Sequence, residues 1–347
     1  MQLSMQLAYA GGFKESADHV VELEKAGLDL VWVAEAYGFD GVSLMGYLAA
    51  RTEQVTIGAG ILPIYTRTPT LLAMTAAGID ALSGGRCVLG LGASGPQVIE
   101  GFHGVPYDKP LARTREIVEI CRKVWAREDR LTHDGPIYHL PLPEGQGTGL
   151  GRPLKIIAKP VRPAIPIYVA ALGEKNVALT AEVADGWLPL FYLPEKAKEV
   201  FGPSLDAGAA KRSGELGPLD ICAGGLCSVG EFDEVKGVLD LFARPMAALY
   251  IGGMGAKGRN FYNALVTRYG YEQEAAEIQD LYLAGKKVEA AALVPDELLQ
   301  LTNLCGPESF IKERIAAFRE AGVTVLNVTP VAPEPVKLVE KLKDWTS

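Results

Sequence analysis

The sequence predicts an α/β protein whose eight parallel strands and surrounding helices close into a (β/α)8 TIM barrel. Short β-branched runs alternate with longer segments in which apolar residues recur every three or four positions, as is typical of βαβ units. Eight such strands can be assigned, and eight strand–helix units are the number that closes a barrel of this kind. Gly and Pro cluster where these strands end rather than in a linker between domains. We therefore expect one domain over residues 1–347.

The expected elements follow the chain in order. The strands are Gln6–Tyr9, Leu30–Val33, Thr56–Ala59, Cys87–Leu91, Pro166–Ala170, Gly186–Leu190, Asp220–Ala223 and Val325–Thr329. The helices that follow most of them, each with an apolar stripe, are Ser16–Ala26, Val42–Arg51, Pro69–Leu82, Leu111–Arg127, Lys175–Ala184, Phe232–Leu241 and Pro335–Trp345.

Two regions are not needed for the eight strand–helix units of a minimal barrel, and we interpret both as insertions. Residues 128–165 are rich in Pro and Gly and contain a hairpin pattern at Leu131–Leu140. Residues 246–304 contain three further helical segments, Asn260–Tyr269, Gln273–Ala284 and Pro295–Thr302.

Composition excludes several classes of function. The chain has 34 Lys and Arg against 42 Asp and Glu, a formal net charge of −8, so it lacks the basic excess that nucleic-acid binding needs. Its apolar runs are shorter than the ~20 residues that cross a bilayer, and its first residues lack a secretory signal pattern. We expect a cytoplasmic protein that acts on a small molecule, with no membrane or nucleic-acid partner. Five cysteines without a CxxC pair, and four histidines without zinc-site spacing, predict reduced thiols and no metal centre.

Active sites of such barrels lie at the carboxyl ends of the strands, so these positions hold the candidate residues. Glu35 follows the second strand, where a carboxylate could orient a substrate or move a proton, although a solvated loop carboxylate is the plain alternative. Tyr65 and Arg67 follow the third strand, and Arg67 could bind an acidic ligand group or hold neighbouring loops together. Gly173 comes just before a helix whose first N–H groups could bind an anion.

The segment Gly90–Gly95 matches the G-x-G-x-x-G pattern after the fourth strand. In a dinucleotide-binding fold this pattern follows the first strand and precedes an acidic strand end by about 20 residues. Here the corresponding window, Leu111–Arg127, has a helical pattern. We therefore favour a barrel loop that contacts a phosphate or a ring, with a purely structural turn as the alternative.

Two longer segments carry a family resemblance. The run TIGAGILPIYTRTP (56–69) and the run DALSGGRCVLGLGASG (80–95) closely resemble the luciferase-like flavin and deazaflavin oxidoreductases, as do ADGW (184–187) and GVTV (322–325). The resemblance covers most of the chain, is weakest over 190–305, and is greatest to the branch that uses coenzyme F420.

This resemblance implies a luciferase-like barrel with the deazaflavin F420 in its mouth. It assigns Gly60 and Ile61 to a bulge behind the ring, joined by a cis peptide bond. The remaining cofactor residues that it implies are Gly92, Ala93, Ser94 and Gly95 after the fourth strand, and Ala170, Ala171, Leu172 and Gly173 on the phosphate side. Lys175, which follows this second loop, could add a positive charge for the phosphate. Glycines in these loops would let the backbone approach a flat ring and present N–H groups to a phosphate.

The sequence departs from the alcohol and sugar-phosphate dehydrogenases of that branch. Their Asp-His after strand two is Glu35-Ala36 here, and their Glu after the strand-four glycines is replaced at Gly95-Pro96. Oxidation of an alcohol requires a base, so we expect reduction of an activated double bond, with Glu35 and Tyr65 as catalytic candidates and Tyr37 or water as other proton sources. An FMN-dependent monooxygenase and a non-catalytic deazaflavin-binding protein remain alternatives. A homodimer is a further expectation.

Overall fold

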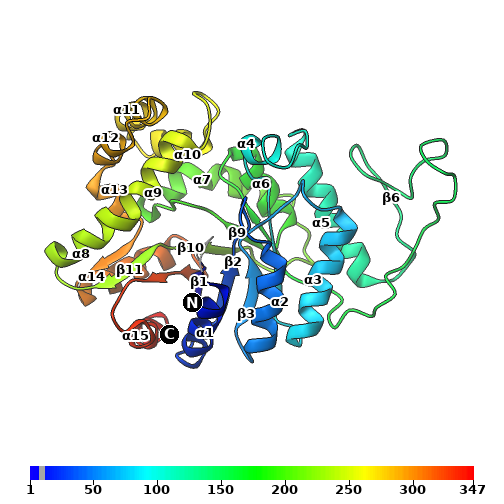
Figure 1. Ribbon diagram of the computed structural model, residues 1–347, viewed down its shortest axis with the longest axis horizontal. Helices are drawn as coiled ribbons and strands as arrows, with labels where there is room; N and C mark the ends of the chain where they lie inside the picture. Colours follow the sequence, from blue (N-terminus) through cyan, green and yellow to red (C-terminus); the bar gives the residue numbers. More distant parts are fainter. Residues whose placement is uncertain (8–11) are drawn as a thin grey trace.

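A closed barrel of eight parallel strands forms the centre of the computed structural model, which describes residues 1–7 and 12–347 (Figure 1). The strands lie in the order β3-β2-β1-β13-β10-β9-β8-β5, and pairing of β3 with β5 closes the ring. Their bounds are β1 (Gln2–Gln6), β2 (Leu30–Val33), β3 (Thr56–Ala59), β5 (Cys87–Gly92), β8 (Ile167–Ala170), β9 (Gly186–Leu188), β10 (Asp220–Ala223) and β13 (Val325–Asn327). The predicted (β/α)8 architecture is confirmed.

The first strand differs from its prediction. It ends at Gln6 instead of beginning there, and residues 8 and 9 of the predicted Gln6–Tyr9 lie outside the described residues. The sequence prediction favoured an apolar run, but Ser4 faces the barrel interior and donates a hydrogen bond to Asn327 Oδ1 at 3.1 Å. A satisfied polar side chain is tolerated inside the barrel, so the strand continues through it.

Helices surround the barrel on the outside. They are α1 (Phe13–Lys25), α2 (Gly41–Arg51), α3 (Pro69–Ser83), α5 (Pro110–Ala126), α6 (Glu174–Val183), α7 (Pro194–Ala209), α14 (Glu308–Glu320) and α15 (Pro335–Thr346). The prediction omitted α7 and α14. Helix α7 contains Pro203 in its interior, a residue that usually ends a helix.

Large side chains fill the inside of the barrel beneath its mouth. Trp32 on β2 and Tyr168 on β8 are both buried, with ring centroids 5.4 Å apart. A Cβ atom at Gly58 on β3 would lie 2.4 Å from the Trp32 ring, so only glycine leaves room for that indole. These rings close the lumen, and the functional surface must therefore lie above them at the strand ends.

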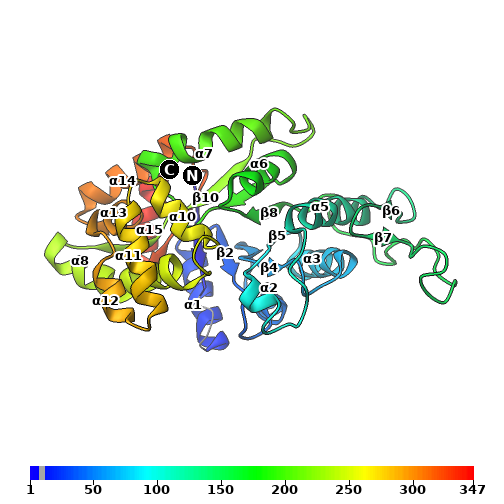
Figure 2. The same cartoon turned by 90° about the horizontal axis from the view of Figure 1, so that it is seen from above.

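Two insertions project on opposite sides of the barrel (Figure 2). The first forms an extended arm between α5 and β8 with the predicted hairpin, whose strands are β6 (His133–Asp134) and β7 (His139–Leu140). The second is helical, and its predicted helices correspond to α10 (Phe261–Arg268), α11 (Glu272–Leu283) and α13 (Asp296–Leu301). The segment predicted as a barrel helix at Phe232–Leu241 begins this second insertion as α8 (Phe232–Val238) and continues helically to Gly253.

A small parallel sheet that the sequence did not predict supports the helical insertion. Its order is β12 (Leu304–Gly306), β11 (Leu226–Val229) and β14 (Thr329–Pro330), so the predicted last strand Val325–Thr329 is divided between two sheets. Across the described residues, helices that combine the length and the apolar composition needed to cross a membrane are absent.

Candidate active site

The floor of the barrel mouth is formed by the loop after β3. The peptide bond between Gly60 and Ile61 is cis, which confirms the prediction for this pair. A Cβ atom on Gly60 would lie 2.9 Å from Gln6 Oε1 and 3.0 Å from Trp32 Cβ. The backbone at Gly60 therefore rests directly on the side chains that end β1 and β2. Strand β4 (Leu62–Pro63) then runs beside the end of β5.

The end of β5 packs against this loop. A Cβ atom on Gly92 would lie 2.8 Å from both Cγ1 and Cδ1 of Ile61. The space left by Gly92 is thus occupied by Ile61 and not left open for a bound ring, which changes the role expected for this glycine. Beyond it, Ala93 and Gly95 are partly exposed, and Ser94 is exposed with a left-handed φ of 58°. The structure brings two of the predicted cofactor loops into direct contact.

The loop after β8 leads into helix α6. Ala170, Leu172 and Gly173 are partly exposed while Ala171 is buried, and Gly173 is the N-cap residue with no side-chain cap. The N–H groups of Glu174 and Lys175 have no hydrogen-bond partner among the described residues, so they are available to an anion, whereas the Asn176 N–H donates to the Gly173 oxygen at 2.9 Å. In the same turn the buried Oδ1 of Asn176 has no hydrogen-bond partner among the described residues.

Phe261, at the start of α10, lies over this loop. A Cβ atom on Gly173 would be 3.2 Å from Cε1 of Phe261, whose side chain is 61% exposed. The helical insertion thus contributes an apolar side chain beside the predicted phosphate site. Sequence analysis missed Phe261 because it lies 88 positions beyond Gly173 in a region of weak resemblance.

Glu35 is held in a buried ion pair. Both of its carboxylate oxygens accept hydrogen bonds from Arg67, at 2.6 and 2.8 Å, and Oε2 also accepts the Gly41 N–H at 2.8 Å. Arg67 donates a further hydrogen bond to Asp40 at 2.7 Å. The Glu35 side chain is 9% exposed, which excludes the solvated-loop alternative. The hydrogen bonds to Glu35 raise the pKa of Arg67, so the guanidinium stays charged.

Tyr65 is also engaged by neighbouring groups. Its hydroxyl donates a hydrogen bond to the backbone oxygen of Asp108 at 2.8 Å, and the Arg113 guanidinium lies 4.9 Å from its ring centroid. Burial raises the pKa of Tyr65 to about 12, and the nearby Tyr107 acts in the same direction. The phenol is therefore protonated at neutral pH, with its proton directed at a carbonyl oxygen.

Gln6 is a candidate that sequence analysis missed. It ends β1 at the mouth, its amide lies against Gly60, and its buried Nε2 has no hydrogen-bond partner among the described residues. Because the strand was predicted to begin at Gln6, this side chain was not placed at a carboxyl end. A buried amide without a partner is costly, which points to a ligand that completes it.

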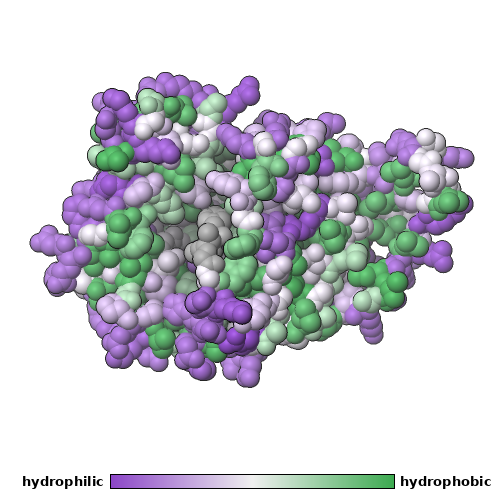
Figure 3. Space-filling model, in the orientation of Figure 1, coloured by the Kyte–Doolittle hydropathy of each residue, from purple (hydrophilic) through white to green (hydrophobic). Residues whose placement is uncertain are grey.

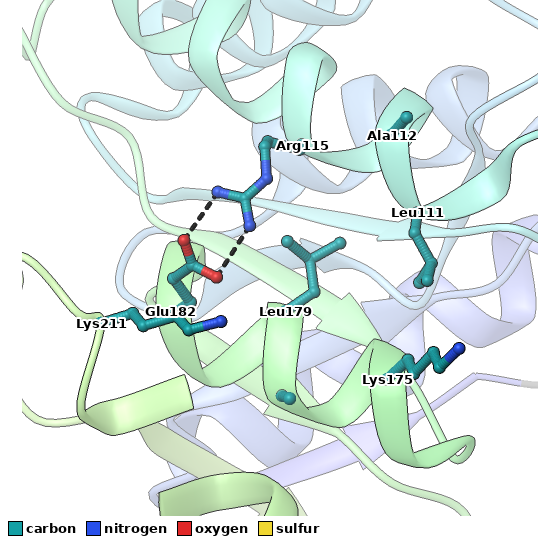
Figure 4. Close-up of a pocket in the computed structure, with 8 residues that line it drawn as sticks. Leu111, Ala112, Arg115, Lys175, Leu179, Glu182 and Lys211 are labelled. Atoms are coloured by element: carbon teal, nitrogen blue, oxygen red, sulfur yellow. Dashed lines mark hydrogen bonds and ion pairs between the residues drawn. The ribbon is translucent and has the colours of Figure 1, made fainter. Parts of the chain in front are cut away.

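Lys175 lies in the first turn of α6, two residues after Gly173. It lines a groove between α5 and α6 together with Arg115, Glu182 and Lys211 (Figure 4). The side chain of Lys175 thus lines this groove on the outside of the barrel, while its backbone lies next to the loop after β8.

Within residues 1–7 and 12–347, no three His, Cys, Asp or Glu side chains are grouped so that they could hold a metal ion. The five cysteines are buried and unpaired. Burial raises the pKa of Cys87 to about 12, so this thiol is protonated and unreactive at neutral pH.

Comparison with solved structures places the barrel in a known class. The fold matches that of a coenzyme F420-dependent tetrahydromethanopterin reductase from Methanopyrus kandleri with a TM-score of 0.77, covering 98% of this chain and 96% of that one at 20% identity. At this level of identity the match establishes the fold alone, a (β/α)8 barrel.

Sequence comparison gives the family. Residues 1–325 match the luciferase-like monooxygenase family. A Mycobacterium tuberculosis protein with the provisional name of a coenzyme F420-dependent oxidoreductase is 42% identical over 343 residues, 97% of both chains. A 5,10-methylenetetrahydromethanopterin reductase of Archaeoglobus fulgidus is 30% identical over 324 residues, 91% of this chain and 90% of that one. This chain belongs to the luciferase-like family, and the resemblance drawn from its motifs is confirmed.

Proposed function

We propose that this protein is a coenzyme F420-dependent oxidoreductase that reduces an activated C=C, C=N or C=O bond of a small organic substrate. The relatives named for F420 support the cofactor, and the mouth offers groups that fit it. Coenzyme F420, when bound, supplies transfer of a hydride. The protein's own contribution is to bind and orient the partners, and to control protons beside them.

Three features of the mouth fit a deazaflavin. The Gly60–Ile61 loop gives a wall whose backbone is close to the barrel floor. The unpartnered Gln6 amide can hydrogen-bond to a polar edge of a ring or substrate. The uncapped start of α6 after Gly173 suits a phosphate, because backbone N–H groups and the helix dipole both favour negative charge there.

The Glu35–Arg67 ion pair favours reduction of the substrate over oxidation of an alcohol. A base that removes a hydroxyl proton must be free to accept it, whereas both oxygens of Glu35 already accept charged hydrogen bonds from Arg67. This observation carries the assignment as a reductase. We assign Glu35 and Tyr65 as positioning residues: Glu35 holds the loop after β2, and Tyr65 holds the loop after β3 against Asp108. The exposed Tyr37 or a water molecule then supplies the proton.

Titration of the purified protein with F420 and with FMN, followed by fluorescence quenching, tests the cofactor. We expect micromolar or tighter binding of F420 and weaker binding of FMN. Reduced F420 is then mixed with enones, imines and aldehydes, and its reoxidation is followed by absorbance without oxygen. Preferential FMN binding with oxygen consumption would establish the monooxygenase instead, and F420 binding without turnover of any substrate would establish a binding protein.

We also propose that the protein is a homodimer. Figure 3 shows apolar side chains along the arm on the right of the molecule. Within the arm, Leu150, Leu154 and Ile157 are 79%, 76% and 97% exposed, and on α3 Met74 is 56% and Leu82 69% exposed. Exposed apolar patches of this kind mark interfaces, and a second copy would cover both surfaces by two-fold symmetry.

A further inference from the structure

Two aromatic side chains are exposed and in contact with each other at the rim of the barrel mouth. Tyr37 is 68% exposed and Phe102 is 65% exposed, and their ring centroids lie 6.2 Å apart with an angle of 52° between the ring planes. Tyr37 belongs to the loop between β2 and α2, whereas Phe102 follows the short helix α4 (Pro96–Ile99) in the loop after β5. Exposed apolar side chains that two separate loops bring together mark surfaces that bind a ligand or a partner.

Both rings are carried by anchored loops. Glu35, two residues before Tyr37, is fixed by its two hydrogen bonds from Arg67. On the other side, the Phe102 N–H donates a hydrogen bond to the Val98 oxygen at 3.0 Å, so the turn that follows α4 is closed by the backbone. The two rings are therefore held in place before a ligand binds, which lowers the entropic cost of binding.

The same loops form part of the mouth. A Cβ atom on Gly41, the residue that begins α2, would lie 3.6 Å from Cδ2 of Leu62 on β4, so the loop after β2 packs beside the loop after β3. The Tyr107 hydroxyl donates a hydrogen bond to the Ser94 oxygen at 3.3 Å, which ties the chain beyond Phe102 back to the end of β5. Figure 1 shows α4 at the same end of the barrel as α10. The two rings therefore lie at the end of the barrel where the proposed function places the reaction.

The charged groups of the Tyr37 loop are engaged with one another. Arg67 is 13% exposed and pairs with Glu35 at 2.6 Å and with Asp40 at 2.7 Å. Asp40 also accepts the Ser43 N–H at 2.9 Å, so it is committed to the start of α2. This network offers neither a free cation nor a free carboxylate to a charged substrate, whereas an aromatic face suits an uncharged one.

We propose that Tyr37 and Phe102 bind the flat, conjugated part of an uncharged substrate, so that the protein prefers aryl-substituted enones, aldehydes or imines to their alkyl counterparts. This inference rests on the proposed function and names its substrate class. A flat conjugated ring can pack on an aromatic face over its whole area, and one such contact increases affinity about two- to tenfold. A puckered aliphatic ring of the same size meets that face with fewer atoms and gains less.

Two enones that differ in one ring test this preference. Benzylideneacetone and its cyclohexyl analogue carry the same enone on a flat or on a puckered ring. Each is titrated into the protein with and without F420 by ligand-observed NMR, and its KM is measured with reduced F420. We expect benzylideneacetone to bind several-fold more tightly, and equal affinities would overturn the aromatic site. Tighter binding of benzylideneacetone without turnover of either enone would support the aromatic site and contradict the proposed reductase.

Ring variants test the two residues. Phe102→Leu and, separately, Tyr37→Leu should each raise the dissociation constant of benzylideneacetone about two- to tenfold and change that of the cyclohexyl analogue little. Tyr37→Phe keeps the ring and should keep the preference in binding, while its kcat reports separately on proton supply. The matched control Phe242→Leu removes a 50% exposed ring from the helical insertion and should bind both enones as the wild type does.

Two results would contradict the substrate site. One is a preference for benzylideneacetone that both Leu variants retain. The other is a change in oligomeric mass of the Phe102→Leu variant, measured by light scattering, with enone binding unchanged, because the rings would then belong to a protein interface. Unchanged melting temperatures confirm that each variant is folded.

Discussion

Gly92 and Ile61 share one space at the mouth: a Cβ atom on Gly92 would come within 2.8 Å of two carbon atoms of Ile61. The loop after β3 and the end of β5 are therefore a single packed unit. Its geometry is also held by the backbone, because the Ile64 N–H donates a hydrogen bond to the Gly92 oxygen at 3.0 Å. A substitution on one side of this contact must therefore displace the residue on the other side.

We expect Gly92→Ala to move Ile61 and weaken F420 binding. Overpacking of a tight contact costs about 1–3 kcal/mol of stability. The double variant Gly92→Ala/Ile61→Val should recover part of the loss, because it removes Cδ1, one of the two Ile61 carbon atoms that the new Cβ atom would meet, and leaves Cγ1. Gly95→Ala is the control, since a Cβ atom there meets only the end of the Gln97 side chain at 3.2 Å. Fluorescence titration and thermal melting measure both effects, and no difference between Gly92→Ala and Gly95→Ala would count against the packed unit.

We expect Glu35→Gln to lower stability more than catalysis. The substitution leaves Arg67, only 13% exposed, with Asp40 as its one remaining anionic partner. Loss of charged hydrogen bonds of this kind costs about 1.5–3 kcal/mol. Chemical denaturation measures this loss, and steady-state kinetics should show kcat within a few-fold of wild type. A fall in kcat by a factor of 10²–10⁴ at normal stability would instead identify Glu35 as a proton-transfer group.

Tyr65→Phe should leave turnover nearly unchanged at neutral pH. The lost hydrogen bond to Asp108 costs about 1 kcal/mol of stability. Spectrophotometric titration gives a second check, because burial raises the pKa of Tyr65 from 10.0 to about 12. The folded chain then holds the Tyr65 proton more tightly than the unfolded chain. The contribution of this proton to the free energy of unfolding is therefore complete below pH 10 and is lost as pH rises from 10 through 12. The Phe variant should lose less stability over that range, and a large drop in its kcat at pH 7 would make Tyr65 the proton donor.

Gln6→Met should weaken binding of the ligand without lowering the stability of the protein. Replacing a buried amide that lacks a partner by an apolar side chain of similar length removes a penalty of about 1–3 kcal/mol, so the melting temperature should hold or rise. If the amide binds cofactor or substrate, kcat/KM should fall about tenfold, which corresponds to ~1.4 kcal/mol. Retained kcat/KM and F420 affinity would remove Gln6 from the site.

Ile157→Asp should dissociate the expected dimer. Placing a charge in an apolar interface leaves it without water or a partner, which is strongly unfavourable. Light scattering after size-exclusion chromatography measures the mass, with Gln273→Asp, on the opposite insertion, as the control. A monomeric wild-type protein at micromolar concentration would contradict the homodimer, and a dimeric Ile157→Asp would exclude this arm position from the interface.

Much of the barrel follows from local sequence. The strands Leu30–Val33 and Asp220–Ala223 are found at their predicted bounds, because burial in the barrel wall leaves a short, mainly apolar run that can be recognised in the sequence alone. Helix α14 carried a comparable signal, with Ile311, Ile315 and Phe318 buried at four- and three-residue spacing, although it was not predicted. The family motif at Gly60–Ile61 also indicated the cis peptide bond that the structure shows.

What only the tertiary structure decided is which side chains meet. Glu35 and Arg67 are 32 positions apart, and their pairing turns a candidate base into an anchored ion pair. Gln6 reached the mouth only through the register of β1, which depends on its neighbours β2 and β13. Phe261 reaches Gly173 through the packing of a distant insertion. Periodicity along the chain reports whether a residue is buried, but ion pairs, strand register and loop contacts depend on closure of the barrel, which brings distant segments together in ways that no local pattern encodes.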